Sequence, residues 1–256
     1  MAAYILVFLT GLALGSFLNV VITRLPQREE FWTGRSRCPH CRVALAWYDN
    51  IPLISYFLLK RGCRFCGETI PPRYPLVELA GGLVALALWR RFPGSSLLFV
   101  YGPFSAALVA LSAIDLERRL LPDVITLPGI ALGLLLALVL PHLSFWEAAL
   151  GALVGGALFY LVAWGYEAWT GKQGMGGGDI KLMAMIGAFL GVKSLPPVIF
   201  ISAGLGTLVG LGMALARGRW RSGEWRTASL PYGPFLALAA LVYLLGRESW
   251  FTGLGP

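Results

Sequence analysis

The chain has 256 residues, of which 57% are hydrophobic and only 13% are charged, and its mean hydropathy is +0.71. A soluble protein has about twice that share of charged residues, so the composition excludes an ordinary soluble domain and indicates a membrane protein. The net charge is +8, but its arginines are dispersed over several loops with no binding fold between them, which argues against a nucleic-acid partner.

Apolar segments recur along the chain at about the 20-residue length that a helix needs to cross a bilayer. The eight segments are 3–22, 75–90, 97–114, 124–140, 147–169, 180–195, 197–216 and 230–246. We therefore expect an all-α polytopic membrane protein with about eight transmembrane helices in the lipid bilayer. Segment 3–22 lacks a preceding basic stretch and a following small-residue cleavage site, so we expect a retained span and not a secretory signal.

The basic residues orient these spans. Eight spans place the loops alternately on two sides, and 17 of the 21 Lys and Arg residues fall on one side. The loops of that side cover 24–73, 118–119, 172–181 and 217–226. The positive-inside rule places this side in the cytoplasm and both termini on the other side.

All four cysteines lie in the long loop between the first two predicted spans. They form two pairs, Cys38-x-x-Cys41 and Cys63-x-x-Cys66, with 21 residues between the pairs. Two such pairs are typical of zinc sites in which four thiolates surround the ion tetrahedrally and leave no open position for water. We therefore predict that these four residues bind a structural Zn²⁺, which would supply folding energy that so short a loop lacks.

Two alternatives to zinc remain for these cysteines. They are two disulfides or four unreactive buried thiols, and disulfides are disfavoured on a loop that faces the reducing cytoplasm. His40 lies inside the first pair and is a possible substitute ligand, but we interpret it as a spacer residue.

Two aspartates lie at the cytoplasmic ends of predicted spans. Asp115 ends the third span, and Asp179 begins the sixth, directly behind the glycines of "GMGGGDIKL". Ionisable residues in or beside a membrane span are costly and mark functional sites. Two inward-facing carboxylates at one depth would share a proton, and one would act as base and the other as acid in peptide hydrolysis. A metal between them is the rival chemistry, but no histidine lies near either residue in the sequence.

Each of these acids also has a structural interpretation. Asp179 precedes "IKLMAMIGAFL" and is a common type of helix N-cap, and Asp123 after Pro122 has the same interpretation for the fourth span. Asp115 would then be a helix-end carboxylate paired with Arg118 or Arg119.

Six sequence motifs, taken together, indicate a protein family. They are "GSFLNVVITRLP" (15–26), the paired CxxC motifs, "NIPLISYFLLKRGCRFC" (50–66), "PPRYPLVEL" (71–79), "IDLERRLLPD" (114–123) and "GMGGGDIKL" (174–182). In this order they resemble the bacterial type IV prepilin leader peptidases, which are membrane aspartic proteases with a G-x-G-D motif. The resemblance covers nearly the whole chain, and although G-x-G-D alone is weak, the ordered set is specific.

The resemblance implies that Asp115 and Asp179 are the catalytic pair. The substrates would be prepilins and pseudopilins with a basic leader, and the protein would lie in the bacterial inner (cytoplasmic) membrane with its active site facing the cytoplasm. The family also N-methylates the newly exposed N-terminus with S-adenosylmethionine, although no residue run here indicates a site for that cofactor.

The predicted organisation follows from these motifs. Residues 1–22 form the first transmembrane helix and 23–74 the zinc-binding loop domain. Residues 75–256 form the helical bundle, with the peptidase core at about 97–216. Glycine at 176, 177 and 178 allows positive φ and close approach of other groups, so we expect Gly176 and Gly178 to make a loop loose enough to admit an extended substrate backbone beside Asp179.

Three polar residues near the first two spans have less specific interpretations. Glu78 would contact substrate or the methyl-donor region, or it is a first-turn helix acid near Arg73. Ser16 and Asn19 are expected to pack and hydrogen-bond between helices.

Two hypotheses outside the proteases also remain open. A transporter would use intramembrane acids as proton relays near the bilayer midplane, but no inverted repeat is visible in the sequence. A structural zinc-dependent scaffold of the pilus export machinery would need the cysteines but not both aspartates.

Overall fold

The structure is a computed structural model that describes residues 1–256 except 28, 31–35, 39, 173, 217–229 and 252–256. Its regular elements are helices, and within the described ranges β-pairing is confined to two isolated antiparallel bridges, Arg37–Ala44 and Gly62–Thr69. The all-α fold class is therefore confirmed. The basic loop 217–226 of the topology argument lies outside the described residues.

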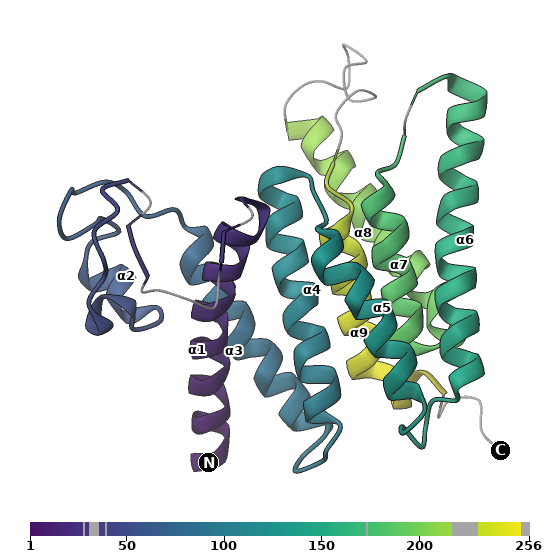
Figure 1. The fold of residues 1–256 in the computed structure, drawn as a ribbon, viewed down its shortest axis with the longest axis horizontal. Coiled ribbons are helices and arrows are strands. Elements are labelled where there is room, and N and C mark those ends of the chain that lie inside the picture. Colours follow the sequence, from purple (N-terminus) through teal and green to yellow (C-terminus); the bar gives the residue numbers. More distant parts are fainter. Residues whose placement is uncertain (28, 31–35, 39, 173, 217–229, 252–256) are drawn as a thin grey trace. The chain divides into compact units, whose positions relative to one another are not determined.

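Each predicted apolar segment corresponds to one long helix (Figure 1). These helices are α1 (Ala2–Arg24), α3 (Arg73–Arg91), α4 (Leu98–Arg118), α5 (Asp123–Ala137), α6 (Phe145–Thr170), α7 (Gly177–Leu190), α8 (Leu195–Ala216) and α9 (Gly233–Phe251). A short helix, α2 (Ile54–Leu58), and three 3-10 turns complete the helical elements of the described chain: Leu25–Gln27, Trp47–Asn50 and Val192–Ser194.

Within the described part of the chain, four helices are long and apolar enough to cross a membrane. They are Ala2–Gln27, Leu98–Arg118, Phe145–Thr170 and Val192–Met213. Asp123–Ala137 and Gly233–Gly246 are apolar but shorter. The eight predicted segments therefore agree with the helices in number, while these four alone meet both requirements.

The chain divides into two compact units, Met1–Ile114 and Asp115–Pro256. In the first unit α1 packs along α3. Asn19 on α1 donates its Nδ2 hydrogen bond to the carbonyl oxygen of Tyr74 on α3 at 3.0 Å, as expected for an interhelical polar residue. The first unit thus contains α1, the cysteine-bearing loop, α3 and residues 98–114 of α4.

In the second unit α7 is the central helix and packs against α5, α6 and α9. Most of its apolar side chains are buried, including Leu182, Met183 and Ile186. Gly151 of α6 and Gly187 of α7 bring these two helix backbones into close contact, because a side chain at either position would overlap the other helix. This packing positions the first turn of α7, which carries Asp179.

The predicted end of the sixth span lies beyond the observed end of α7. We expected 180–195, but α7 ends at Leu190, where Gly191 has φ +79° and a 3-10 turn follows. Apolarity continues through this break, so a hydropathy pattern cannot locate it. The glycine conformation ends the helix, and α8 then begins at Leu195.

Candidate active site

Asp115 lies in the last turn of α4 and is buried, with 6% of its surface exposed. Its Oδ2 accepts a hydrogen bond from the backbone N–H of Gly233, the first residue of α9, at 2.9 Å. An N–H at a helix N-terminus is oriented toward an anion, and the helix dipole favours negative charge there. The fold therefore positions this carboxylate through a residue 118 positions away in the chain.

Asp179 is the third residue of α7 and is half-buried. Its backbone N–H donates to the carbonyl oxygen of Gly176 at 3.1 Å in the first turn of the helix. Its carboxylate interacts electrostatically with that of Asp115, so the structure brings the two acids together although α4 and α7 are far apart in the sequence. This arrangement suits a proton-sharing pair.

The glycine run does not have the conformation expected from the sequence. None of Gly176, Gly177 and Gly178 has positive φ, and α7 already begins at Gly177. Small size is what the fold needs at Gly178, because a Cβ there would lie 2.8 Å from the Cβ of Leu121. The expected loop is thus a tight helix start, in which the first turn of α7 lies against the segment that precedes α5.

The N-cap interpretations are also corrected. Gly176 is the N-cap of α7, so Asp179 is not, and Pro122 is the N-cap of α5. Asp123 instead forms an ion pair with Lys181, whose Nζ donates to both carboxylate oxygens at 2.7 Å and 2.8 Å. This exposed pair links the first turns of α5 and α7.

The sequence analysis missed the segment before α9. The Tyr232 hydroxyl lies 2.8 Å from the Ser202 hydroxyl on α8, and the Tyr232 side chain interacts electrostatically with Asp179. Gly233 is the hydrogen-bond donor to Asp115. The "PYGP" at 231–234 was the available signal, since two prolines around a glycine mark a turn at a helix start.

The four cysteines form a second candidate site, within the first unit. Their Sγ atoms all lie within 4.8 Å of one another, and His40 is not part of this group. Cys38 and Cys66 are 3.8 Å apart and Cys41 and Cys63 are 4.0 Å apart, measured between sulfurs. The cysteines are free thiols, so the disulfide alternative is not what the structure shows.

Each CxxC pair lies on a similar tight turn. In the first, the Arg42 N–H donates to the Cys38 carbonyl oxygen and Arg42 has φ +57°. In the second, the Gly67 N–H donates to the Cys63 carbonyl oxygen and Gly67 has φ +71°. The two turns bring all four sulfurs within 4.8 Å of one another.

The donor set fits a tetrahedral zinc ion. With Zn–S bonds of about 2.3 Å, the sulfurs of such a site are roughly 3.8 Å apart, close to the distances found here. The backbone N–H groups of Cys66 and Phe65 also donate to Cys63 and lower the pKa of its thiol to about 7, whereas desolvation and the other cysteines raise the pKa of the Cys66 thiol to about 11. Metal ligation needs the thiolate form, which the two backbone donors favour at Cys63.

Comparisons with known proteins agree with this architecture. Residues 9–92 match the bacterial peptidase A24 N-terminal domain, and residues 103–211 match the type IV leader peptidase family. The chain belongs to the type IV leader peptidase family. The second match contains both Asp115 and Asp179, and the first contains all four cysteines. With its apolar helices, this membership identifies a multi-pass membrane protein.

Curated relatives extend over nearly the whole chain. A prepilin leader peptidase/N-methyltransferase of Aeromonas hydrophila is 38% identical over 95% of this chain and 91% of its own length. Proteins of the same name from Burkholderia pseudomallei (strain 1026b) and Klebsiella pneumoniae are 39% and 44% identical, over 96% and 77% of this chain and 86% and 89% of their own lengths. No solved structure matches the chain.

Proposed function

We propose that the protein is a membrane aspartic endopeptidase that removes the basic leader from type IV prepilins and pseudopilins. The observation that carries this proposal is the Asp115–Asp179 pair: one carboxylate is buried and held by the Gly233 N–H, and the other lies half-buried on the first turn of α7. The relatives' names supply the substrate class.

The pair supports general acid–base peptide hydrolysis. With one proton shared between them, the ionised carboxylate removes a proton from water, which attacks the scissile carbonyl carbon, while the protonated one donates its proton to the carbonyl oxygen. Collapse of the tetrahedral adduct breaks the C–N bond, and the leaving amine takes up the proton first removed from water. Asp115 and Asp179 carry both roles.

Location in the bacterial inner membrane, with the acids at the cytoplasmic side, is part of the same proposal. The excess of Lys and Arg in one set of loops supports it through the positive-inside rule. A transporter hypothesis is less well supported, because both acids lie at helix ends, at the end of α4 and the start of α7, and not in mid-helix.

The test is leader cleavage by single-residue variants. Asp115→Asn and Asp179→Asn remain in the membrane but leave the prepilin uncut, as seen by separating precursor from mature pilin on a gel. The matched control is Asp123→Asn, which changes an exposed aspartate outside the pair and retains cleavage. Normal processing by either of the first two variants would reject the assignment.

We further propose two cofactors for this chain. One Zn²⁺ would be bound by Cys38, Cys41, Cys63 and Cys66, on the strength of the sulfur geometry. With four protein ligands its role would be structural. S-adenosylmethionine would donate a methyl group to the new pilin N-terminus, which the relatives' names support. Incubating the purified protein with a synthetic prepilin, with and without this donor, followed by mass spectrometry, tests cleavage and methylation together.

A further inference from the structure

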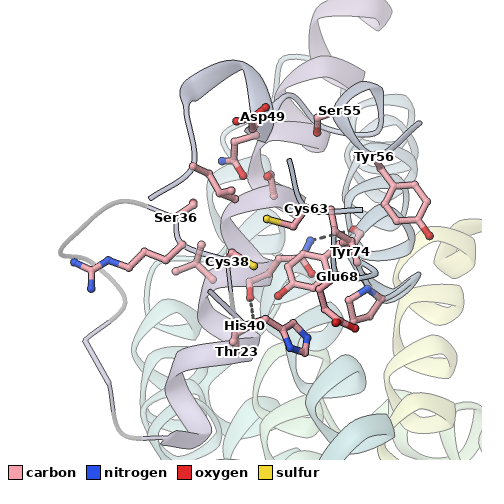
Figure 2. A pocket seen from close by; sticks show the side chains of 18 of the residues that line it. Thr23, Ser36, Cys38, His40, Asp49, Ser55, Tyr56, Cys63, Glu68 and Tyr74 are labelled. Atoms are coloured by element: carbon pink, nitrogen blue, oxygen red, sulfur yellow. Dashed lines mark hydrogen bonds between the residues drawn. The ribbon is translucent and has the colours of Figure 1, made fainter. Parts of the chain in front are cut away.

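The first unit contains a cavity of about 580 Å³ that the peptidase proposal does not use. It is bordered by α1, α3 and the cysteine-bearing loop, and its lining includes Asn19, Asp49 and Glu78. In Figure 2, Asp49 and Ser55 mark one end of the cavity and His40 and Glu68 the other. Sites for cofactors and other small molecules have volumes of roughly 300–1,000 Å³, so this cavity has the capacity for one such ligand.

Carboxylates are concentrated around this cavity. Residues 1–114 contain five acidic residues, and all five line it: Glu29, Glu30, Asp49, Glu68 and Glu78. By contrast, only four of the nine described Lys and Arg residues of the same segment line it: Arg24, Arg37, Arg42 and Arg64. The cavity thus offers both signs of charge, with an excess of acceptors. That lining suits a ligand with positive charges and hydroxyl donors as well as a carboxylate.

Two buried oxygens at the cavity lack a hydrogen-bond partner among the described residues: Oδ1 of Asn19 and Oδ2 of Asp49. Asn19 is 3% exposed, and its Nδ2 donates a hydrogen bond to the Tyr74 carbonyl oxygen. This bond fixes the orientation of the amide and leaves Oδ1 as an acceptor. The Asp49 side chain is 1% exposed, and its Oδ1 is held by Arg64 at 2.6 Å. A buried acceptor without a donor is costly, so both atoms call for a ligand with donors.

Glu78 adds a third oriented group. It is 8% exposed on α3, where it lies in the second turn, so it is not the first-turn acid considered from the sequence. Its Oε2 accepts the backbone N–H of Leu53 at 2.8 Å, and the Ser16 hydroxyl also bonds to the carboxylate. Both donors are neutral, and no described Lys or Arg forms an ion pair with Glu78. A buried carboxylate in this situation favours a bound cation.

We propose that this cavity binds S-adenosylmethionine, which deepens the methyltransferase part of the proposed function and rests on it. This ligand has a sulfonium cation and an ammonium group for the carboxylates, ribose hydroxyls for buried acceptors, and a carboxylate for the lining arginines. In the dinucleotide-binding α/β fold an Asp or Glu accepts hydrogen bonds from a ribose hydroxyl, and the carboxylates of this cavity offer the same chemistry. A purely basic leader peptide matches the arginines poorly, so we assign the cavity to the methyl donor.

When bound, the donor would supply an electrophilic methyl group: the amine lone pair would form the N–C bond, the C–S electron pair would stay on sulfur, and the methylated ammonium would release one proton. The contribution of the chain is binding. Asp49 and Glu78 neutralise positive charge, and Asn19 accepts a donor group, each held in place by its own hydrogen bond within the unit. Asp115 and Asp179 belong to the other unit, so donor binding is separable from cleavage.

The experiment measures binding and not turnover. The purified full-length protein, prepared without chelator, is titrated with S-adenosyl-[methyl-³H]methionine by equilibrium dialysis. Asp49→Asn and Glu78→Gln preserve side-chain shape and should each weaken binding by about tenfold or more, the order expected when a buried charged contact is lost. Glu167→Gln is the matched control, since Glu167 is exposed on α6, and Asp179→Asn should bind like the wild type.

Ultraviolet cross-linking of the labelled donor to the wild-type protein provides a second measurement that does not depend on how the variants fold. The label should map to peptides that contain Asn19 or Asp49. If the wild type binds the donor and both cavity variants bind it with the same affinity, the proposed location is wrong. Label found in peptides of 115–256 would also show that the location is wrong. Either result would leave the methyltransferase proposal standing. Absence of binding by the wild type would reject both. If a basic leader peptide without the rest of the pilin displaces the donor, the cavity belongs to the leader and the proposal is wrong.

Discussion

The backbone N–H of Gly233 donates a hydrogen bond to Oδ2 of Asp115 at 2.9 Å, and this contact joins the start of α9 to the end of α4. The position also needs a glycine for steric reasons. A Cβ on residue 233 would lie 2.8 Å from the same oxygen and 3.2 Å from Cδ2 of Leu121. Gly233 is therefore a positioning residue for the proposed catalytic pair.

Gly233→Ala should slow leader cleavage by about 10- to 100-fold, because a hydrogen bond to a charged group is worth about 1.5–3 kcal/mol and the added methyl group displaces the carboxylate. The measurement is the initial rate of cleavage of a synthetic prepilin. Gly204→Ala is the matched control, since a Cβ at that position on α8 meets no atom within 4 Å. A wild-type rate for Gly233→Ala would show that this contact does not orient the reacting acid.

Adjacent glycines at the start of α7 should respond differently to the same substitution. Gly178→Ala places a Cβ 2.8 Å from the Cβ of Leu121, which cannot rotate away, so the first turn of α7 and Asp179 must shift. Gly177→Ala meets nothing within 4 Å. We expect at least a tenfold loss of cleavage for Gly178→Ala, about 1.4 kcal/mol in the barrier, and less than a twofold change for Gly177→Ala.

The comparison uses cleavage rates together with melting temperatures of both variants in detergent. Similar losses in the two variants would mean that backbone flexibility of the glycine run matters, as the sequence first suggested. Unimpaired cleavage in both variants would show that the contact between Gly178 and Leu121 does not position Asp179.

Cleavage should have an optimum in pH. At low pH both carboxyls carry protons and no base remains, and at high pH both are ionised and no acid remains, so the rate falls on each side. The check is the pH dependence of kcat/KM with a synthetic prepilin. Activity should also resist chelators, provided the structural zinc is retained, and serine-directed acylating reagents. A rate that falls on one side alone, within the pH range where the protein stays folded, would contradict a proton-sharing pair.

Loss of a cysteine ligand should act on the loop before it acts on peptide chemistry. Cys38→Ser should abolish zinc binding and expose residues 36–70 to trypsin, because the proposed metal would hold together two turns that have little apolar core. The wild type should contain one zinc per chain by metal analysis after purification without chelator. His40→Ala should keep its zinc, since His40 lies outside the sulfur cluster. A zinc-free wild-type protein purified under reducing conditions would refute the site.

Local patterns sufficed for the elements and for part of the sites. Apolar segments predicted the long helices, since a chain in lipid must satisfy its backbone polar groups internally. They misplaced the end of α7, because Gly191 breaks the helix while apolarity continues. The CxxC spacing predicted the cysteine cluster, which the structure assembles within 4.8 Å. Glycine allows both positive φ and close approach, and the structure shows close approach, at Gly178 in a helix start. Contact of this segment with substrate stays a prediction.

The sequence by itself determined the helical membrane class, the four thiols of the cluster and the two aspartates as candidates, because each depends on residue type and on spacing along the chain. The tertiary structure decided what surrounds them. Gly233 reaches Asp115 across 118 positions, and a single cavity gathers all five acidic residues of the first 114. Such contacts between distant residues depend on which helices pack together and how closely. Helix packing is set by small residues at crossing points, as at Gly151 and Gly187, and no local periodicity records the partner.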